Sequence, residues 1–277
     1  MNAELKRNLG RSYFTQSANP SDLSGAVSKS LLWNFHKSPY KWFNDPNPFK
    51  STASMDLGRL IHCLVLTPDD LNTDFSVSPF DSFRTNDARK WKEDAELAGK
   101  TVITIQTLEE ATAASKAFLS TPEINHLNKY ETEVAAFASI GATRVKGMID
   151  IVPKTGTDLW DLKTTATIQS ADELVRMIIN RGYHWQAALY LDLWNAATSE
   201  SRDGFVFAFM ETAAPYETAF VRLSSELIDL GRSGTQCGRH QGYMQAIFKW
   251  QECVSRNHWP KMVEGIHTAE LPKWILP

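Results

Sequence analysis

Three consecutive segments with the side-chain alternation of β-strands constrain the fold of this chain most strongly. Residues 131–140 (ETEVAAFASI), 143–152 (TRVKGMIDIV) and 157–165 (TDLWDLKTT) are separated by only a few residues, as successive strands of one sheet are. Residues 204–211 (GFVFAFME) are almost entirely apolar, which is typical of a strand buried on both faces. Together these segments predict an α/β fold with a mixed central β-sheet.

Helical patterns surround these strands and predict the layers that flank the sheet. Thr107 and Glu110 have the spacing of a capping box and predict a helix start. One long helix is expected from Ser224 or Ser225 to about Arg256, although glycines interrupt it. The other predicted elements are helices over 22–37, 54–66, 87–98, 171–181 and 183–197, and strands over 101–105 and 216–223.

The composition fits one compact domain. The chain has 277 residues, of which 43% are hydrophobic and 22% charged, and it contains neither a linker-like tract nor an internal repeat. We therefore expect a single domain over 1–277, in which 1–20 form an N-terminal arm. The formal net charge is −3, so a nucleic-acid ligand would require basic side chains to be segregated from acidic ones.

The cysteines and the apolar runs bear on the compartment of the protein. The three cysteines are widely spaced, which argues against a disulfide framework. The first residues lack the apolar core of a signal peptide, and no apolar run is long enough to cross a bilayer. These features favour the reducing cytoplasm and predict no membrane partner.

Acidic and basic side chains converge on two of the predicted strands. Residues two apart on a strand share a face, so Asp161 and Lys163 project together, and Asp150 ends the preceding strand. If these strands form a hairpin, two carboxylates and one ammonium meet. Carboxylates suit Mg²⁺, and a lysine beside such an ion can orient or deprotonate the attacking water and stabilise transition-state charge. Glu133, on the strand before, can supply a third carboxylate.

A D-x-K tripeptide by itself is usually an exposed ion pair. Here both residues lie in an otherwise apolar sheet, where a buried carboxylate normally has a partner, often a metal. On the predicted helix 54–66, Gly58 and His62 share a face, which lets the backbone come close to the sheet. Gln186 and Tyr190 have the same spacing. Each of these pairs, taken alone, is explained by packing.

Five short motifs occur in one order along the chain. They are Gly58-x-x-x-His62, an acid at Glu133, KGMID at 146–150, DLKTT at 161–165 and QAALY at 186–190. In this order they resemble the PD-(D/E)XK nucleases of the RecB and lambda-exonuclease kind. YHWQAALY at 183–190 and WP…LPKWI at 259–275 are most similar to the RecE-like phage exonucleases. The resemblance runs from about Ser28 to Trp274 and implies a restriction-endonuclease-like core.

The resemblance also implies roles for the matching residues. Lys163 would be the catalytic lysine, acting with the carboxylates of Asp150, Asp161 and Glu133. Glu131 lies on the same predicted strand face as Glu133 and is an alternative to it. One or two Mg²⁺ or Mn²⁺ ions would be held by His62, Glu133, Asp150, Asp161 and the Leu162 carbonyl. The residues expected to contact DNA or organise the site are Arg59, Lys146, Thr164, Thr165, Gln186 and Tyr190.

Some relatives in this superfamily carry an iron–sulfur cluster whose first cysteine precedes a proline near the N-terminal helix. This chain has Ser38 before Pro39, and its cysteines do not cluster, so we predict no iron–sulfur cluster. A zinc site formed by Cys237, His240, Cys253 and His258 is disfavoured, because all but the last of these residues fall within one predicted helix.

The function that the resemblance implies is processive 5′→3′ digestion of linear double-stranded DNA. The product would be a 3′ single-stranded tail for a single-strand annealing protein. A ring-shaped homo-oligomer is expected, and the sequence leaves open whether it is a trimer or a tetramer. The alternatives are an endonuclease or a Cas4-like end-trimming nuclease on the same fold, and a module that binds DNA ends without cutting them.

Overall fold

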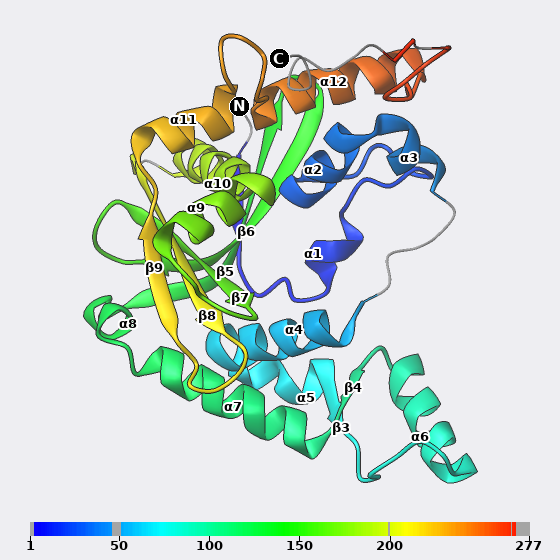
Figure 1. Ribbon diagram of the computed structural model, residues 1–277, viewed down its shortest axis with the longest axis vertical. Coiled ribbons are helices and arrows are strands. Elements are labelled where there is room, and N and C mark those ends of the chain that lie inside the picture. Colours follow the sequence, from blue (N-terminus) through cyan, green and yellow to red (C-terminus); the bar gives the residue numbers. More distant parts are fainter. Residues whose placement is uncertain (1–2, 46–50, 199, 267, 270–277) are drawn as a thin grey trace.

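A seven-stranded mixed sheet forms the centre of the computed structural model, which describes residues 3–45, 51–198, 200–266 and 268–269 (Figure 1). The strands are β1 (Glu4–Lys6), β2 (Val27–Ser28), β5 (Tyr130–Ile140), β6 (Thr143–Pro153), β7 (Asp158–Thr165), β8 (Gly204–Glu211) and β9 (Thr218–Arg222). Their order is β1-β5-β6-β7-β8-β9, and β2 pairs with β6. The β7–β8 and β2–β6 pairs are parallel and the others antiparallel. A small parallel sheet joins β3 (Phe75–Val77) to β4 (Thr101–Ile103).

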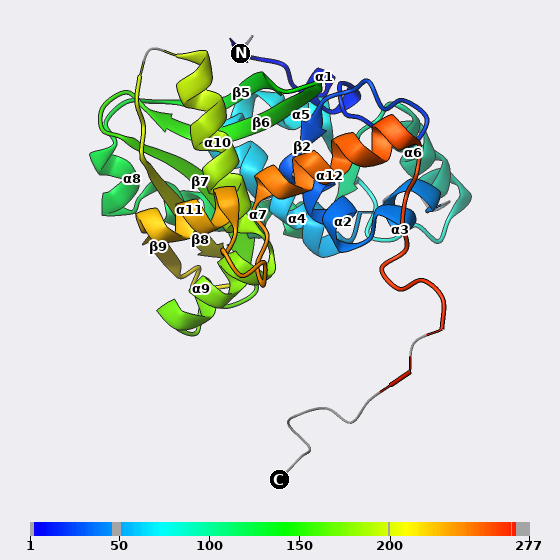
Figure 2. The same cartoon turned by 90° about the horizontal axis from the view of Figure 1, so that it is seen from above.

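Helices cover both faces of the central sheet. On one face α10 (Tyr183–Ala197) packs against β5, β6 and β8, and on the other α4 (Ala53–Leu66) and α7 (Ile105–Leu119) pack against β7 and β8. Outside α10, α2 (Lys29–Lys37) and α12 (Tyr243–Arg256) lie side by side (Figure 2). The remaining helices are α1 (Ser12–Thr15), α3 (Pro39–Asn44), α5 (Leu71–Asp74), α6 (Asn86–Leu97), α8 (Pro122–His126), α9 (Ala171–Asn180) and α11 (Ser225–Ser233).

Strand β8 divides the hydrophobic interior into two layers. All of its residues are buried, which confirms the prediction of a strand covered on both faces. Phe205, Phe207 and Phe209 belong to the core beneath α10, whereas Ala208 and Met210 belong to the core beneath α4 and α7. Side chains therefore alternate along β8. One face of β8 and of its parallel neighbour β7 lies under α10, and the other face lies under α4 and α7.

The predicted strands over 131–165 and the predicted helix 54–66 are confirmed as β5, β6, β7 and α4. The single long helix predicted from Ser224 or Ser225 to Arg256 is wrong. Helix α11 ends at Ser233, and α12 begins only at Tyr243. Between them Gly234 and Gly238 have φ angles of 67° and 71°, which glycine adopts without the strain of a side chain. These glycines turn the chain between two helices.

Two predicted helix starts are also wrong. The helix predicted over 22–37 begins only at Lys29, because Val27 and Ser28 pair with β6 and the Ser28 side chain accepts a hydrogen bond from the Leu31 amide. The capping box at Thr107 and Glu110 does not form. Thr104 caps α7 instead, and its side chain accepts from the Thr107 amide, so β4 stops at Ile103 and α7 follows at once.

The segment expected to form an N-terminal arm is joined to the sheet. Strand β1 extends it through antiparallel pairing with β5, and Arg7 Nε lies 2.6 Å from Glu131 Oε2. Helix α1 follows β1, and its Tyr13 is buried in a cluster with Ala135 and Phe137 of β5. Among the described residues, no helix combines the length and the apolar character that crossing a membrane requires.

Candidate active site

The candidate site lies where β6 and β7 separate. Ile151 pairs with Trp160, so that Asp150 stands opposite Asp161 at the next position. There the Leu162 amide donates a hydrogen bond of 2.9 Å to the Asp150 side chain rather than to the β6 backbone. The Asp150 carboxylate therefore fills the gap between the two strands, and the backbone of β7 holds it in place.

Asp161 is only 1% exposed, and its two carboxylate oxygens meet different elements. Gln186 of α10 donates to Oδ1, and the Lys163 ammonium pairs with Oδ2. In the described part of the chain, Oδ2 has no hydrogen-bond partner besides that ammonium. Lys163 Nζ also lies 4.8 Å from the centroid of the Tyr183 ring and 5.8 Å from that of Phe207. The Gln186 amide thus holds the Asp161 carboxylate in one orientation.

His62 approaches from the opposite helical layer. Its Nδ1 lies 3.8 Å from Asp150 Oδ2, and 29% of its side chain is exposed. Helix α4 can come this close to β7 because Gly58 faces it: a Cβ at Gly58 would lie 2.8 Å from the Thr164 hydroxyl. The close approach expected for Gly58 and His62 is therefore present, and the site combines donors from both faces of the sheet.

Burial is the main influence on the ionisation of these groups. It raises the pKa of Asp150 to about 6, while Lys163 and the Leu162 amide act in the opposite direction. It also raises the pKa of Asp161 to about 6, with a further increase from Asp150. Burial, and then Lys163, lower the pKa of His62 to about 4, so the imidazole is neutral at pH 7. Burial would lower the pKa of Lys163, but Asp161 and Asp150 outweigh it and raise this pKa, so the ammonium stays charged.

These donors fit a hard divalent cation. Two carboxylates that are costly to ionise without a counter-charge, a neutral imidazole and the incompletely bonded Asp161 Oδ2 are suitable ligands. No three His, Cys, Asp or Glu side chains of the described residues already surround one point. Asp150, Asp161 and His62 could each supply a ligand to an ion, and the Leu162 carbonyl, water and substrate phosphate would complete its coordination.

Glu133 lies beside Asp150, and Glu131 does not. In the register of β5 and β6, Thr132 pairs with Ile151 and Val134 with Ile149, which places Glu133 opposite Asp150. Glu133 has a left-handed backbone with φ 48°, and its charge contributes to the raised pKa of Asp150. Glu131 is instead paired with Arg7. The geometry thus favours Glu133 as the third carboxylate.

The prediction that Lys146 contacts DNA is wrong. Its side chain is fully buried, its ammonium donates to the Tyr13 carbonyl, and it lies 4.1 Å from the centroid of the Tyr13 ring. Lys146 therefore anchors α1 to β6. Arg59 is exposed on α4, but its Nη1 bonds to Thr101 Oγ1 at 3.2 Å and lies 3.6 Å from Asp56. The Thr165 hydroxyl bonds to the Thr167 carbonyl at the end of β7.

Tyr190 is buried behind the acidic pair. Gly147 of the KGMID motif makes room for it, since a Cβ there would lie 2.5 Å from the Tyr190 ring. Burial and then the neighbouring Tyr13, Asp161 and Asp150 raise the pKa of Tyr190 well above its usual value. Tyr190 is only 8% exposed, and its ring packs against Gly147 of β6.

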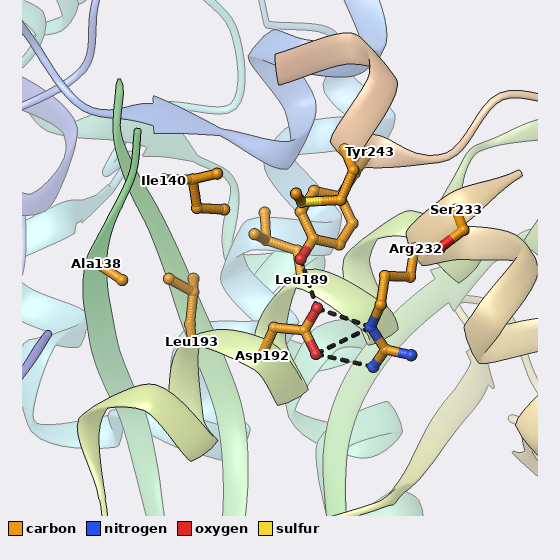
Figure 3. A pocket seen from close by; sticks show the side chains of 9 residues that line it. Ala138, Ile140, Leu189, Asp192, Leu193, Arg232, Ser233 and Tyr243 are labelled. Atoms are coloured by element: carbon orange, nitrogen blue, oxygen red, sulfur yellow. Dashed lines mark hydrogen bonds and ion pairs between the residues drawn. The ribbon is translucent and has the colours of Figure 1, made fainter. Parts of the chain in front are cut away.

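A separate cavity of about 340 Å³ lies between β5, α10, α11 and α12 (Figure 3). Asp192 accepts hydrogen bonds from Arg232 at 2.8 and 2.9 Å and from the Tyr243 hydroxyl at 2.5 Å, as Figure 3 shows. None of the residues of the β6–β7 site lines this cavity. Its polar network ties α10, α11 and α12 together.

The zinc alternative also receives no support from the geometry. Cys237 is exposed in the turn between α11 and α12, whereas Cys253 is buried within α12. The helix on which the sequence argument against this site relied is therefore broken. Within the described residues, however, Cys237, His240, Cys253 and His258 form no group that could hold an ion.

We expect His62→Ala to reduce metal-dependent activity and to change the metal preference. A neutral imidazole suits Mn²⁺ better than Mg²⁺, so the loss should be greater in Mn²⁺. The measurement is activity against the concentration of each metal, with His126→Ala, at the exposed end of α8, as the control. Two titration curves that match those of the wild type would remove His62 from the metal site.

The fold and the family of the chain agree with this site. The chain is similar in structure to a predicted exonuclease from Eubacterium rectale, with a TM-score of 0.58 and 13% identity over 91% of this chain and 85% of that one. SSO0001 gives a TM-score of 0.33 at 11% identity, covering 78% and 91%. Rai1 from Scheffersomyces stipitis gives 0.27 at 15% identity, covering 71% and 59%.

No protein of curated function matches the chain. The E. rectale structure supports the fold alone, and the two weaker likenesses carry no argument. The family model of a PDDEXK-like domain, in contrast, matches residues 28–271, which include every residue of the site described above. The chain therefore belongs to the family described as a PDDEXK-like domain of unknown function (DUF3799).

Proposed function

We propose that this protein is a divalent-metal-dependent exonuclease acting on linear double-stranded DNA. The observation that carries the proposal is the buried cluster of Asp150, Asp161 and Lys163 in the gap between β6 and β7. A divalent ion bound there would lower the pKa of a water molecule and offset charge on the phosphate. A PDDEXK-like family and the five motifs in order support phosphodiester hydrolysis as the chemistry.

Five side chains of the site have defined tasks in this proposal. Asp150 and Asp161 provide anionic ligands, and Gln186 fixes the orientation of Asp161. His62 provides a neutral ligand. Because its pKa is raised, Lys163 remains an ammonium near neutral pH. We therefore assign Lys163 to orienting the water and stabilising charge on the phosphate, and not to removing a proton.

The direction of digestion and the partners are part of the proposal. The RecE-like motifs support 5′→3′ digestion that leaves a 3′ tail for a single-strand annealing protein. Arg59, which is exposed on α4, is the proposed contact for a 5′-phosphate. A ring of three or four copies around the DNA would keep the enzyme on its substrate, and light scattering of the purified protein measures that number.

Labelled DNA distinguishes the candidate functions. In Mg²⁺ or Mn²⁺ we expect loss of a 5′ label from a linear duplex before loss of a 3′ label, no cleavage with a chelator, and an intact closed circle. Opening of the circle would favour an endonuclease, and earlier loss of the 3′ label would reverse the polarity. Tight binding to ends without cleavage in either metal would favour the non-catalytic module.

A further inference from the structure

Lys29 is a buried cation that the nuclease mechanism above does not use. It is the first residue of α2 and is only 7% exposed. Its Nζ donates a hydrogen bond of 3.0 Å to the carbonyl of Arg181, the C-cap residue that follows α9. An ammonium has three donors, and in the described part of the chain no carboxylate forms an ion pair with this one.

Lys29 and Lys163 both contact the ring of Tyr183. The Lys29 Nζ lies 4.9 Å from the centroid of the Tyr183 ring, and the Lys163 Nζ lies 4.8 Å from the same centroid. The two ammonium nitrogens are therefore less than about 10 Å apart. They come from segments far apart in the sequence, and Tyr183, which begins α10, holds both.

The groups around Lys29 disfavour its charged form. Burial, and then Lys163, Lys37 and Arg181, lower its pKa to about 7, and Asp161 acts in the opposite direction. Asp161 is already bonded by Gln186 and Lys163. Burying an ammonium without a carboxylate is costly, and an anion beside it removes that cost.

We propose that Lys29 binds the phosphate next to the scissile one in the strand that is cut. A phosphate on Lys163 and its neighbour on Lys29 would place the strand along the Tyr183 side of the site. This inference rests on the proposed nuclease function. The competing view is that Lys29 only caps the C-terminal end of α9 through the Arg181 carbonyl, where a cation is favourable.

Neutral phosphates in the substrate separate these two views. We would compare the wild type with Lys29→Gln on duplexes that carry a single methylphosphonate on either side of the scissile phosphate. One neutral position should slow the wild type about tenfold, as loss of a charge-assisted hydrogen bond does. Lys29→Gln should be about tenfold slower on ordinary DNA and lose nothing further at that position.

Lys37→Gln is the matched control, because Lys37 is exposed at the other end of the same helix. It should respond to the methylphosphonate as the wild type does. Lys29→Gln could instead slow every substrate by the same factor, so that the effects of the substitution and of the methylphosphonate multiply. In that case Lys29 has only a structural role and the proposal is wrong. A wild type that tolerates neutral phosphates on both sides overturns it as well, even if the variant does not fold.

Binding of the same duplexes, followed by fluorescence anisotropy in a chelator, keeps the two proposals distinguishable. If the wild type binds DNA in the chelator but does not cut it in Mg²⁺ or Mn²⁺, the nuclease proposal fails. The Lys29 proposal is then decided by whether the neutral phosphate weakens binding of the wild type but not of Lys29→Gln. If the wild type cuts DNA and the effects of Lys29→Gln and of the neutral phosphate on the rate multiply, only the Lys29 proposal fails.

Discussion

Lys163→Ala should abolish cleavage of linear DNA and leave the fold in place. The variant loses the ammonium that pairs with Asp161 Oδ2 and faces the substrate phosphate in the proposed mechanism. Loss of one such charge in a buried site lowers turnover by about 10³-fold. Asp161→Ala should be equally inactive, because it removes a metal ligand. The measurement is single-turnover digestion at saturating metal.

Lys249→Ala serves as the control for Lys163→Ala. Lys249 is an exposed lysine on α12 whose Nζ lies 3.2 Å from Glu252, and its loss should leave turnover unchanged. Circular dichroism confirms that both variants are folded. Turnover of Lys163→Ala within a few-fold of the wild type would end the assignment of Lys163 as the catalytic lysine.

Asp150→Asn should be inactive and yet more stable than the wild type in the absence of metal. The Asp150 pKa of about 6 lies above its ordinary value of 3.8, so at higher pH the ionised group costs the folded state free energy. An asparagine oxygen can still accept from the Leu162 amide. The expected gain in the free energy of unfolding at pH 8 is about 1–3 kcal/mol.

The pH dependence of that gain identifies its cause. Because burial raises the pKa, the cost is fully present above pH 6 and is relieved as the pH falls from 6 towards 4, where the wild-type carboxyl becomes protonated. Thermal unfolding with a chelator at pH 8 and pH 4.5 measures this. The variant should be more stable than the wild type at pH 8, and most of this difference in stability should disappear at pH 4.5. A variant less stable than the wild type at pH 8 would contradict the electrostatic reading.

Adding metal should reverse the order of stability. A metal ion that binds only the folded state raises the stability of that state. The wild type retains the carboxylates of both Asp150 and Asp161 for this ion. Asp150→Asn should gain little from Mg²⁺ or Mn²⁺, whereas the wild type should gain several degrees. Equal shifts in the two proteins would place the metal away from Asp150.

The strand pairing that builds the site could be predicted from local patterns. Alternation over 143–165 fixes which residues share a face, and short turns make the strands neighbours, so Asp150, Asp161 and Lys163 converge as expected. The choice between Glu131 and Glu133 could not be made in this way. It depends on the register of β5 against β6, which places Glu133 opposite Asp150, and on Arg7, which pairs with Glu131.

Contacts between distant segments were beyond the sequence argument. Lys146 shares a strand with Asp150 and resembled a DNA-facing lysine, but Tyr13 of α1 covers it. Lys29 has no helical or strand pattern that marks it, and its position depends on the end of α9 and on Tyr183.

The packing of α3, which follows α2, against Trp259 and Pro260 has a consequence for the order of folding during synthesis. The Tyr40 amide bonds to the Pro260 carbonyl at 3.2 Å, and Phe43 stacks on Trp259 with ring centroids 4.4 Å apart. Lys29 begins α2, so its surroundings depend on residues translated more than two hundred positions later. A nascent chain therefore carries β6 and β7 before its N-terminal helices can dock. We expect such a chain to remain inert towards DNA until α12 and Trp259 have left the ribosome.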